Sequence, residues 1–184
     1  MKFTTKEIKT SKKTKESLQL VHIVGIGNIT RLDDGIAIRI INELEKKNYP
    51  NYIKISDLGT GVFDLPLIFE GWSYGIIIDA VNIANLKSGE IIEMIIKKNN
   101  IPNFTGFSST HNFDVLNALK LAYALQDFPL PKEILLIGVQ VEKINGFGLI
   151  LSKTIENTIP KLVKKIDKAI MKYVHSSETV NFSK

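Results

Sequence analysis

The stretch LVHIVGIGNITRLDDG, residues Leu20–Gly35, decides how this chain folds. It opens with an apolar run that ends in two glycines, Gly25 and Gly27, and a segment with helical spacing follows. A strand, a glycine-containing turn and a helix in this order are typical of the first unit of an α/β domain. The strand is apolar throughout, which indicates that both faces of its sheet are covered.

The same stretch raises the possibility of a dinucleotide-binding loop, which its residues disfavour. That loop requires Gly-x-Gly-x-x-Gly, and Thr30 stands in place of the third glycine. Asp33 and Asp34 would also put two negative charges where a phosphate would bind. An aspartate at a helix start is a favoured N-cap, so capping alone is an alternative role for one member of this pair.

Strand-like and helix-like segments alternate along the rest of the chain. The expected strands are residues 20–27, 52–59, 74–81, 90–98 and 133–141, and the expected helices are 34–47, 64–72, 112–125 and 153–174. Residues 99–110 are expected to form a long loop, and the charges in 90–98 place that strand near a sheet edge. The pattern predicts a single three-layer α/β domain, with a twisted, mostly parallel sheet of about five strands and helices on both faces.

Charge and length divide the chain into a domain and two extensions. Of the net charge of +5, residues 1–16 carry +4, because they hold six lysines and two glutamates. Residues 1–18 are therefore expected to be a basic, disordered arm, residues 19–174 the domain, and residues 175–184 a frayed tail. The basic residues are not interleaved with aromatic ones, so no nucleic-acid partner is expected.

Composition also bears on the compartment. No apolar run reaches the length of a membrane-spanning helix, and Glu16 and His22 argue against a signal peptide. The chain contains no cysteine, which excludes disulfides, thiolate metal sites and cysteine nucleophiles. The prediction is a cytoplasmic protein without a membrane partner.

Three polar features follow strand-like runs, where ligands bind in open α/β sheets. Asp33–Asp34 follow the first strand, Asp79 follows the apolar residues of the third, and His111 precedes the helix 112–125. A carboxylate leaving a buried strand needs hydrogen bonds, a positive partner or a metal. The positive potential at a helix start favours neutral imidazole, which is the form that binds metals. Two aspartates and this histidine would make an oxygen and nitrogen site for a divalent transition metal.

The other two histidines are expected to have no part in such a site. His22 lies within the first strand and is expected to be packed there, and His175 lies in the predicted tail. Serine and zinc protease motifs are also missing from the sequence, since it contains neither Gly-x-Ser-x-Gly nor His-Glu-x-x-His.

An ordered set of motifs resembles the hydrogenase maturation endopeptidases. The motifs are GIGNITRLDDG followed by IAIRI, then DLGTG, IIIDA, STHN, and IGVQ with a later GFGL, and the resemblance covers about residues 20–172. It implies an α/β fold and an aspartyl endopeptidase that trims the C-terminal extension of a nickel–iron hydrogenase large-subunit precursor. It also implies that two acidic residues and a histidine recognise nickel, which the substrate supplies. By motif position these residues are Asp34, Asp79 and His111.

The resemblance implies further roles in substrate binding. Gly27 and Asn28 would form the tight loop that lets the aspartates reach the site. Asp57, Gly59 and Thr60 match a family motif at a strand end and would line the substrate groove, although an ordinary turn is an equal alternative.

The chain departs from the family pattern at three positions. Ala37 and Leu58 stand where glycine is common, and Val141 stands where many members have proline. None of these positions belongs to the trio of Asp34, Asp79 and His111.

The mechanism and two rival functions stay open at this point. Either Asp34 or Asp79 could act as the general base, or both could position the metal. The rival functions are a metal-dependent hydrolase of another peptide or amide, and a non-catalytic chaperone of the hydrogenase large subunit.

Overall fold

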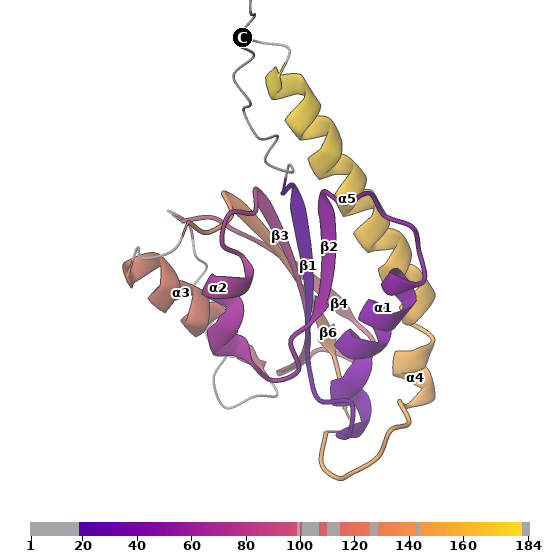
Figure 1. Cartoon of the computed structure of the whole chain (residues 1–184). Helices are drawn as coiled ribbons and strands as arrows, with labels where there is room; N and C mark the ends of the chain where they lie inside the picture. Colours follow the sequence, from indigo (N-terminus) through magenta and orange to yellow (C-terminus); the bar gives the residue numbers. More distant parts are fainter. Residues whose placement is uncertain are drawn as a thin grey trace, which may run out of the picture.

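The strands of this chain stack into one sheet between two layers of helices, as the alternating sequence pattern predicts (Figure 1). The computed structural model describes residues 19–98, 100, 107–109, 115–125, 129–142 and 144–181. The predicted basic arm, residues 1–18, lies outside the described residues, and so does His111. Among the residues that are described, none of the helices combines the length and the apolar character needed to cross a bilayer.

Six strands form the sheet, in the order β2-β1-β3-β6-β4, with β5 paired to β3. Their bounds are β1 Val21–Ile26, β2 Ile53–Asp57, β3 Tyr74–Ile83, β4 Ile91–Ile96, β5 Phe107–Ser109 and β6 Glu133–Gln140. β2, β1, β3 and β6 are parallel, whereas β4 is antiparallel to β6 and β5 is antiparallel to β3. The predicted fold class is confirmed, and so is the edge position of the charged strand β4.

The helices cover the two faces of the sheet unequally. Their bounds are η1 Leu32–Gly35, α1 Ile36–Glu45, η2 Val62–Asp64, α2 Leu65–Ile68, α3 Val115–Leu125, α4 Lys153–Glu156 and α5 Ile159–Asn181. α2 and α3 lie on one side of the sheet, and α1, α4 and α5 lie on the other (Figure 1). The core divides accordingly: Ile76 and Ile78 of β3 pack with α1 and α5, and Ile77 and Val81 pack with α2 and α3.

Two sequence predictions were wrong in detail. The expected loop 99–110 contains the short strand β5, and the expected single helix 153–174 is two helices, α4 and α5. α5 continues to Asn181, so residues 175–181 are helical and do not fray. Hydrophobic spacing stops marking the helix after Val174, since His175-Ser-Ser-Glu carries no apolar residue, although nothing in it breaks a helix.

His22 is a buried polar residue of β1 that is satisfied within the fold. Its Nδ1 lies 2.9 Å from the carbonyl oxygen of Ile68, and its Nε2 lies 2.9 Å from Ser56 Oγ. A carbonyl can only accept, so Nδ1 carries the proton and Nε2 accepts from the serine hydroxyl. Burial, as the largest cause, lowers the pKa of His22 to about 4. The prediction that this histidine is packed is confirmed.

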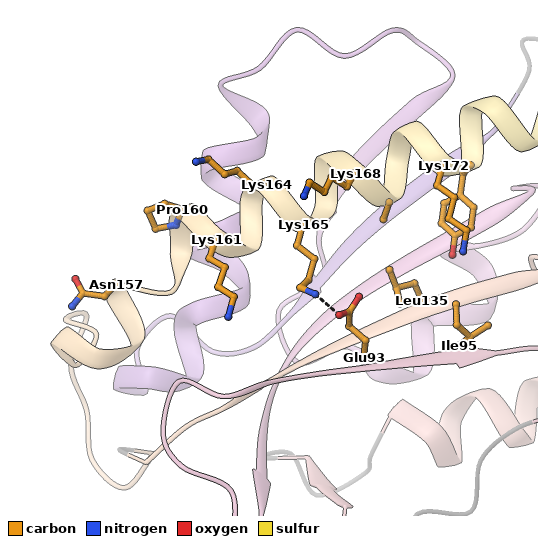
Figure 2. Close-up of a pocket in the computed structure, with 12 residues that line it drawn as sticks. Glu93, Ile95, Leu135, Asn157, Pro160, Lys161, Lys164, Lys165, Lys168 and Lys172 are labelled. Carbon is orange, nitrogen blue, oxygen red and sulfur yellow. Dashed lines mark hydrogen bonds and ion pairs between the residues drawn. The ribbon is translucent and has the colours of Figure 1, made fainter.

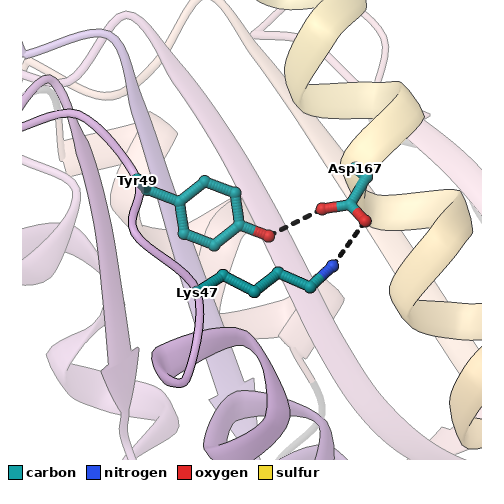
Figure 3. A network of polar contacts seen from close by, with 3 residues as sticks. All are labelled: Lys47, Tyr49 and Asp167. Atoms are coloured by element: carbon teal, nitrogen blue, oxygen red, sulfur yellow. Dashed lines mark hydrogen bonds and ion pairs between the residues drawn. The ribbon is translucent and has the colours of Figure 1, made fainter.

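A polar network ties α5 to the segment that joins α1 to β2 (Figure 3). Tyr49 Oη donates to Asp167 Oδ1 at 2.7 Å, and Lys47 Nζ pairs with Asp167 Oδ2 at 2.5 Å. Burial first, and then the hydrogen bond to Asp167, raises the pKa of the Tyr49 phenol. One carboxylate therefore holds two residues of the connecting segment against the long C-terminal helix.

The buried imidazole makes the stability of the fold depend on pH. The unfolded chain takes up a proton at His22 near pH 6.5, whereas the folded chain resists it until about pH 4. Stability is therefore full above about pH 6.5 and falls as the pH drops toward 4, by up to about 3 kcal/mol from this residue. Urea unfolding of the wild type and of His22→Phe at pH 7 and pH 4.5 should show a clearly smaller pH dependence in the variant. Equal pH dependence in both proteins would contradict this account of His22.

Removal of the Asp167 carboxylate should loosen α5. We expect Asp167→Ala to lower the free energy of unfolding by about 1–2 kcal/mol, because it breaks a hydrogen bond and a half-exposed ion pair together. Glu43→Ala is a matched control, since Glu43 in α1 pairs only with the exposed Lys46 and should change stability by less than about 0.5 kcal/mol. Thermal denaturation of the two variants measures the difference in stability. Equal losses of stability in Asp167→Ala and Glu43→Ala would contradict a stabilising role of the Asp167 network.

Candidate functional site at the switch point of the sheet

The connections of the first three strands make a switch point at the carboxyl ends of β1 and β3, the place at which open α/β sheets form a crevice for ligands, and we call it the crevice here. The chain passes from β1 to β2 through α1 on one face, and from β2 to β3 through α2 on the other face. β1 and β3 are neighbours in the sheet. The two crossover connections therefore diverge at the carboxyl ends of these two strands. Ligands in open α/β sheets bind at such a point. Asp33 and Asp34 in η1 follow β1 at this crevice.

Two glycines allow the segment after β1 to return tightly over the strand. A Cβ at Gly25 would lie 2.5 Å from Cγ1 of Ile41, and a Cβ at Gly27 would overlap the carbonyl oxygen of Asp34. Both positions therefore need glycine for close approach of the backbone. Gly27 N–H also donates to the carbonyl oxygen of Gly59 at 2.8 Å, which joins the loop after β1 to the loop after β2. The role of Gly27 that the structure shows is in positioning Asp34.

The two adjacent aspartates are both fully buried, and they contact different parts of the chain. Asp33 Oδ1 accepts from the backbone N–H of Ser152 at 2.6 Å, and Ser152 immediately precedes α4. Asp34 Oδ2 accepts from the backbone N–H of Asn28 at 3.1 Å, in the loop that follows β1. Asp33 thus anchors a distant segment, whereas Asp34 is held at the crevice. Neither side chain caps η1 or α1, so the alternative of simple N-capping is wrong.

Asp79 lies inside β3 and at the end of β1. β3 continues two residues beyond the predicted strand 74–81, as far as Ile83. Asp79 pairs in register with Ile26, the last residue of β1. Its side chain lies on the same face as Ile77 and Val81, the face that α2 and α3 cover, because alternate residues of a strand share a face. It is fully buried, and η1, which carries Asp34, contacts β3 as well as α1.

The third predicted ligand cannot be placed directly, because His111 lies outside the described residues. The nearest described residue before it is Ser109, which pairs with Val81, two residues beyond Asp79. β5 is antiparallel to β3, so the chain from Phe107 to Ser109 runs along β3 toward Asp79. Among the described residues, no group of three His, Cys, Asp or Glu side chains could hold a metal ion. The predicted metal site therefore depends on His111.

The remaining predicted substrate residues form turns next to the crevice. Asn28 Oδ1 accepts from Thr30 N–H at 2.9 Å and from Thr30 Oγ1 at 2.7 Å. Asp57 Oδ1 accepts from Gly59 N–H at 2.7 Å, and Gly59 has the positive φ of 53° that favours glycine. Thr60 is exposed beside this turn. These bonds give Asn28, Asp57 and Gly59 a structural role, and a role of all four residues in substrate binding stays a prediction.

Gln140 is a positioning residue that the sequence argument did not single out. It is 4% exposed at the end of β6, its Oε1 accepts from Ile83 N–H at 2.8 Å, and its Nε2 donates to Asn82 Oδ1 at 3.3 Å. It thereby fixes the part of β3 that carries β5. The sequence did contain an indication of this role. Gln140 is a polar residue at the end of an apolar strand, just as Asp79 follows an apolar run.

A large groove on the described surface lies away from this crevice. It has a volume of about 770 Å³ and lies between α5 and the strands β4 and β6, over Leu135 and Ile95 (Figure 2). Five lysines of α5 line it, and one of them, Lys165, pairs with Glu93. A lysine-lined groove contains no carboxylate pair for hydrolysis, so the crevice at the end of β1 is the better candidate for the active site.

Filling the space at Gly27 should displace Asp34. Gly27→Ala places a methyl group against the Asp34 carbonyl oxygen, and we expect a loss of about 1–3 kcal/mol in stability from overpacking. Gly59→Asn is the control, because a Cβ there meets nothing within 4 Å and asparagine tolerates a positive φ. Denaturant unfolding of both variants makes the comparison, and a Gly27→Ala protein as stable as Gly59→Asn would contradict the close packing described.

Comparison with known proteins places this geometry in a family. A family model described as hydrogenase maturation protease matches residues 38–169, a range that includes Asp79 and His111 and begins just after Asp34. The hydrogenase 2 maturation protease of Escherichia coli (strain K12) is 30% identical over 149 residues, covering 78% of this chain and 86% of that protein.

Solved structures of hydrogenase maturation proteases resemble this chain as well. The [NiFe] hydrogenase maturation protease HybD from Thermococcus kodakarensis is 28% identical, with a TM-score of 0.67, over 81% of this chain and 97% of that one. The hydrogenase maturating endopeptidase HybD from E. coli has the same fold, with a TM-score of 0.69 at 24% identity, over 83% of this chain and 92% of that one. The chain described here therefore belongs to the hydrogenase maturation proteases.

Proposed function

We propose that this protease removes the C-terminal extension of a nickel–iron hydrogenase large-subunit precursor after nickel has been inserted. The observation that carries the proposal is that Asp34 and Asp79, from different elements, are both buried at the carboxyl end of β1 in a hydrogenase maturation protease. The nickel–iron class is supported by the Thermococcus relative, which is described as a [NiFe] hydrogenase maturation protease. The reaction takes place in the cytoplasm, which agrees with a chain that has no cysteine.

Nickel enters this proposal as part of the substrate. Carboxylate oxygen and imidazole nitrogen suit a divalent transition metal, so Asp34, Asp79 and His111 together would recognise a precursor that has received its metal. The backbone N–H of Asn28 holds one oxygen of Asp34 at 3.1 Å and so fixes the direction of the carboxylate. A ligand held in this way is oriented before the substrate arrives.

Cleavage of the peptide bond requires an activated water and a proton for the leaving amine. Asp34 or Asp79 acts as the general base that takes a proton from water as the water oxygen attacks the carbonyl carbon, and the resulting carboxyl group gives that proton to the leaving amine as the C–N bond breaks. This gives an aspartyl endopeptidase in which carboxylates serve both recognition and chemistry. An asparagine at either position keeps the shape of the side chain and its ability to coordinate weakly, but it cannot accept the proton.

A processing assay on nickel-loaded, purified precursor tests the proposal. We expect Asp34→Asn, Asp79→Asn and His111→Ala each to lower the rate of cleavage by about 100-fold or more, in line with the loss of a general base or a metal-positioning group. Glu43→Gln is the control, because Glu43 pairs with the exposed Lys46 on the surface of α1 and has no assigned role in the site, and this variant should cleave at nearly the wild-type rate.

The outcomes discriminate between functions. Cleavage at the wild-type rate by Asp34→Asn or His111→Ala would refute the assigned roles. Stable binding of the precursor by the wild type without any product would indicate a chaperone. Cleavage of unrelated peptides that depends on metal added to the enzyme would indicate a hydrolase with a different substrate.

A further inference from the structure

Exposed apolar side chains concentrate beside the crevice, in the loop of residues 144–150 that connects β6 to α4. Phe147 is 93% exposed, Ile150 is 81% exposed and Leu149 is 57% exposed. These are three of the large apolar side chains that the described surface leaves open, and they fall within four consecutive residues. A contiguous exposed apolar patch of this kind marks an interaction surface more often than single exposed residues do.

The 144–150 loop is fixed to the loop that carries the aspartates. Gly148 N–H donates to the carbonyl oxygen of Thr30 at 2.8 Å, and Leu32 N–H donates to the carbonyl oxygen of Gly148 at 2.9 Å. A Cβ at Gly148 would lie 2.6 Å from a methyl carbon of Leu32, so the backbone of the loop packs closely against the Leu32 side chain. Just beyond the loop, Asp33 accepts from the backbone N–H of Ser152.

Two arginines complete the attachment. Arg31 Nη2 donates to the carbonyl oxygen of Ile144 at 3.2 Å, and Arg39 Nη2 donates to the carbonyl oxygen of Leu149 at 2.9 Å. The hydrogen bonds satisfy the backbone of the loop and leave its apolar side chains outside. Figure 1 shows this loop beneath the start of α1, at the end of the sheet where η1 follows β1. The loop therefore lies beside the segment that leads from β1 to Asp34, and a protein docked on that segment can contact these side chains as well.

The shape of the surface indicates what covers it. A side chain exposed to 93% projects from the protein, so it requires a hollow on the partner and does not itself form a pocket for a peptide residue. A short, extended C-terminal peptide has no such hollow, whereas a folded protein can offer one. Aromatic and aliphatic side chains that enter a pocket on a partner typically dominate the affinity of an interface.

We infer that Phe147 and Ile150 anchor the folded body of the hydrogenase large-subunit precursor, by entering an apolar pocket on its surface next to the extension that is cut. This inference rests on the proposed function, and it adds a second requirement to it. The protease recognises the folded precursor through these two side chains, and recognises the metal through the aspartates. A precursor that had nickel nearby but lacked the folded pocket would bind weakly.

The test compares Phe147→Ser/Ile150→Ser with the wild type and with Met171→Ser. Met171 is a matched control, because it is 55% exposed on α5, outside the 144–150 loop. With nickel-loaded precursor as substrate, we expect the double variant to raise KM by about 30-fold or more and to change kcat by less than about threefold. Met171→Ser should change neither constant. Circular dichroism verifies that all three proteins are folded.

A binding measurement separates this inference from the proposed function. Intact precursor is titrated against the protease in an Asp34→Asn background, with and without the double substitution. Loss of affinity in the double variant supports the inference even if the wild type cuts nothing, in which case the proposed function fails alone. Equal affinity and equal KM in wild type and double variant overturn the inference. Failure of the precursor to bind any form of the protease overturns it as well.

Discussion

Asp34 can lie over the end of β1 only because Gly27 has no side chain. A Cβ at Gly27 would occupy the place of the Asp34 carbonyl oxygen, and one at Gly25 would collide with Ile41 of α1. This close approach brings η1 and α1 onto the strand and directs the chain across one face of the sheet. The crevice between β1 and β3, the burial of the acidic pair and the path of the loop after β2 all follow from it.

Buried carboxylates at this edge are costly unless polar groups compensate them. The chain supplies backbone N–H groups: that of Asn28 to Asp34, and that of Ser152 to Asp33. Asp33 thereby links the first helical turn to a segment more than a hundred residues later, and the same segment carries the exposed apolar side chains of the 144–150 loop. The acidic pair and the exposed apolar side chains are thus connected at one corner of the molecule, which suits the proposed inspection of a folded substrate.

Much of the fold followed from the spacing of apolar residues. Continuous apolar runs located β1, β3 and β6, the alternation of apolar and polar residues located β2, and the charges of residues 90–98 placed β4 at an edge. The strand β5 was missed because it is only three residues long and its pairing with β3 is a long-range contact that local pattern does not reveal. The end of α5 was missed because the periodic apolar signal stops at Val174 while the helix continues to Asn181.

The sequence located two aspartates that the structure buries, whereas the roles of Asp34, Asp79 and His111 in one site stay a prediction. A charge after an apolar run correctly marked Asp34 and Asp79 as buried residues at one edge, since an ionised group is rarely left there without a purpose. Asp33 and Asp34 differ in role because Asp33 accepts a hydrogen bond from the backbone N–H of Ser152. The local sequence pattern around residue 33 gives no indication of this distant partner. Gln140 and the 144–150 loop were not recognised for the same reason, because their importance lies in what they contact.

The central claim is that Asp34, Asp79 and His111 share one metal. Diffraction data collected at the nickel absorption edge from crystals of the protease bound to uncleaved, nickel-loaded precursor would measure this directly. The account predicts an anomalous peak within bonding distance of both carboxylates and of the imidazole of His111. A peak elsewhere, or a His111 ring turned away from Asp34 and Asp79, would contradict it.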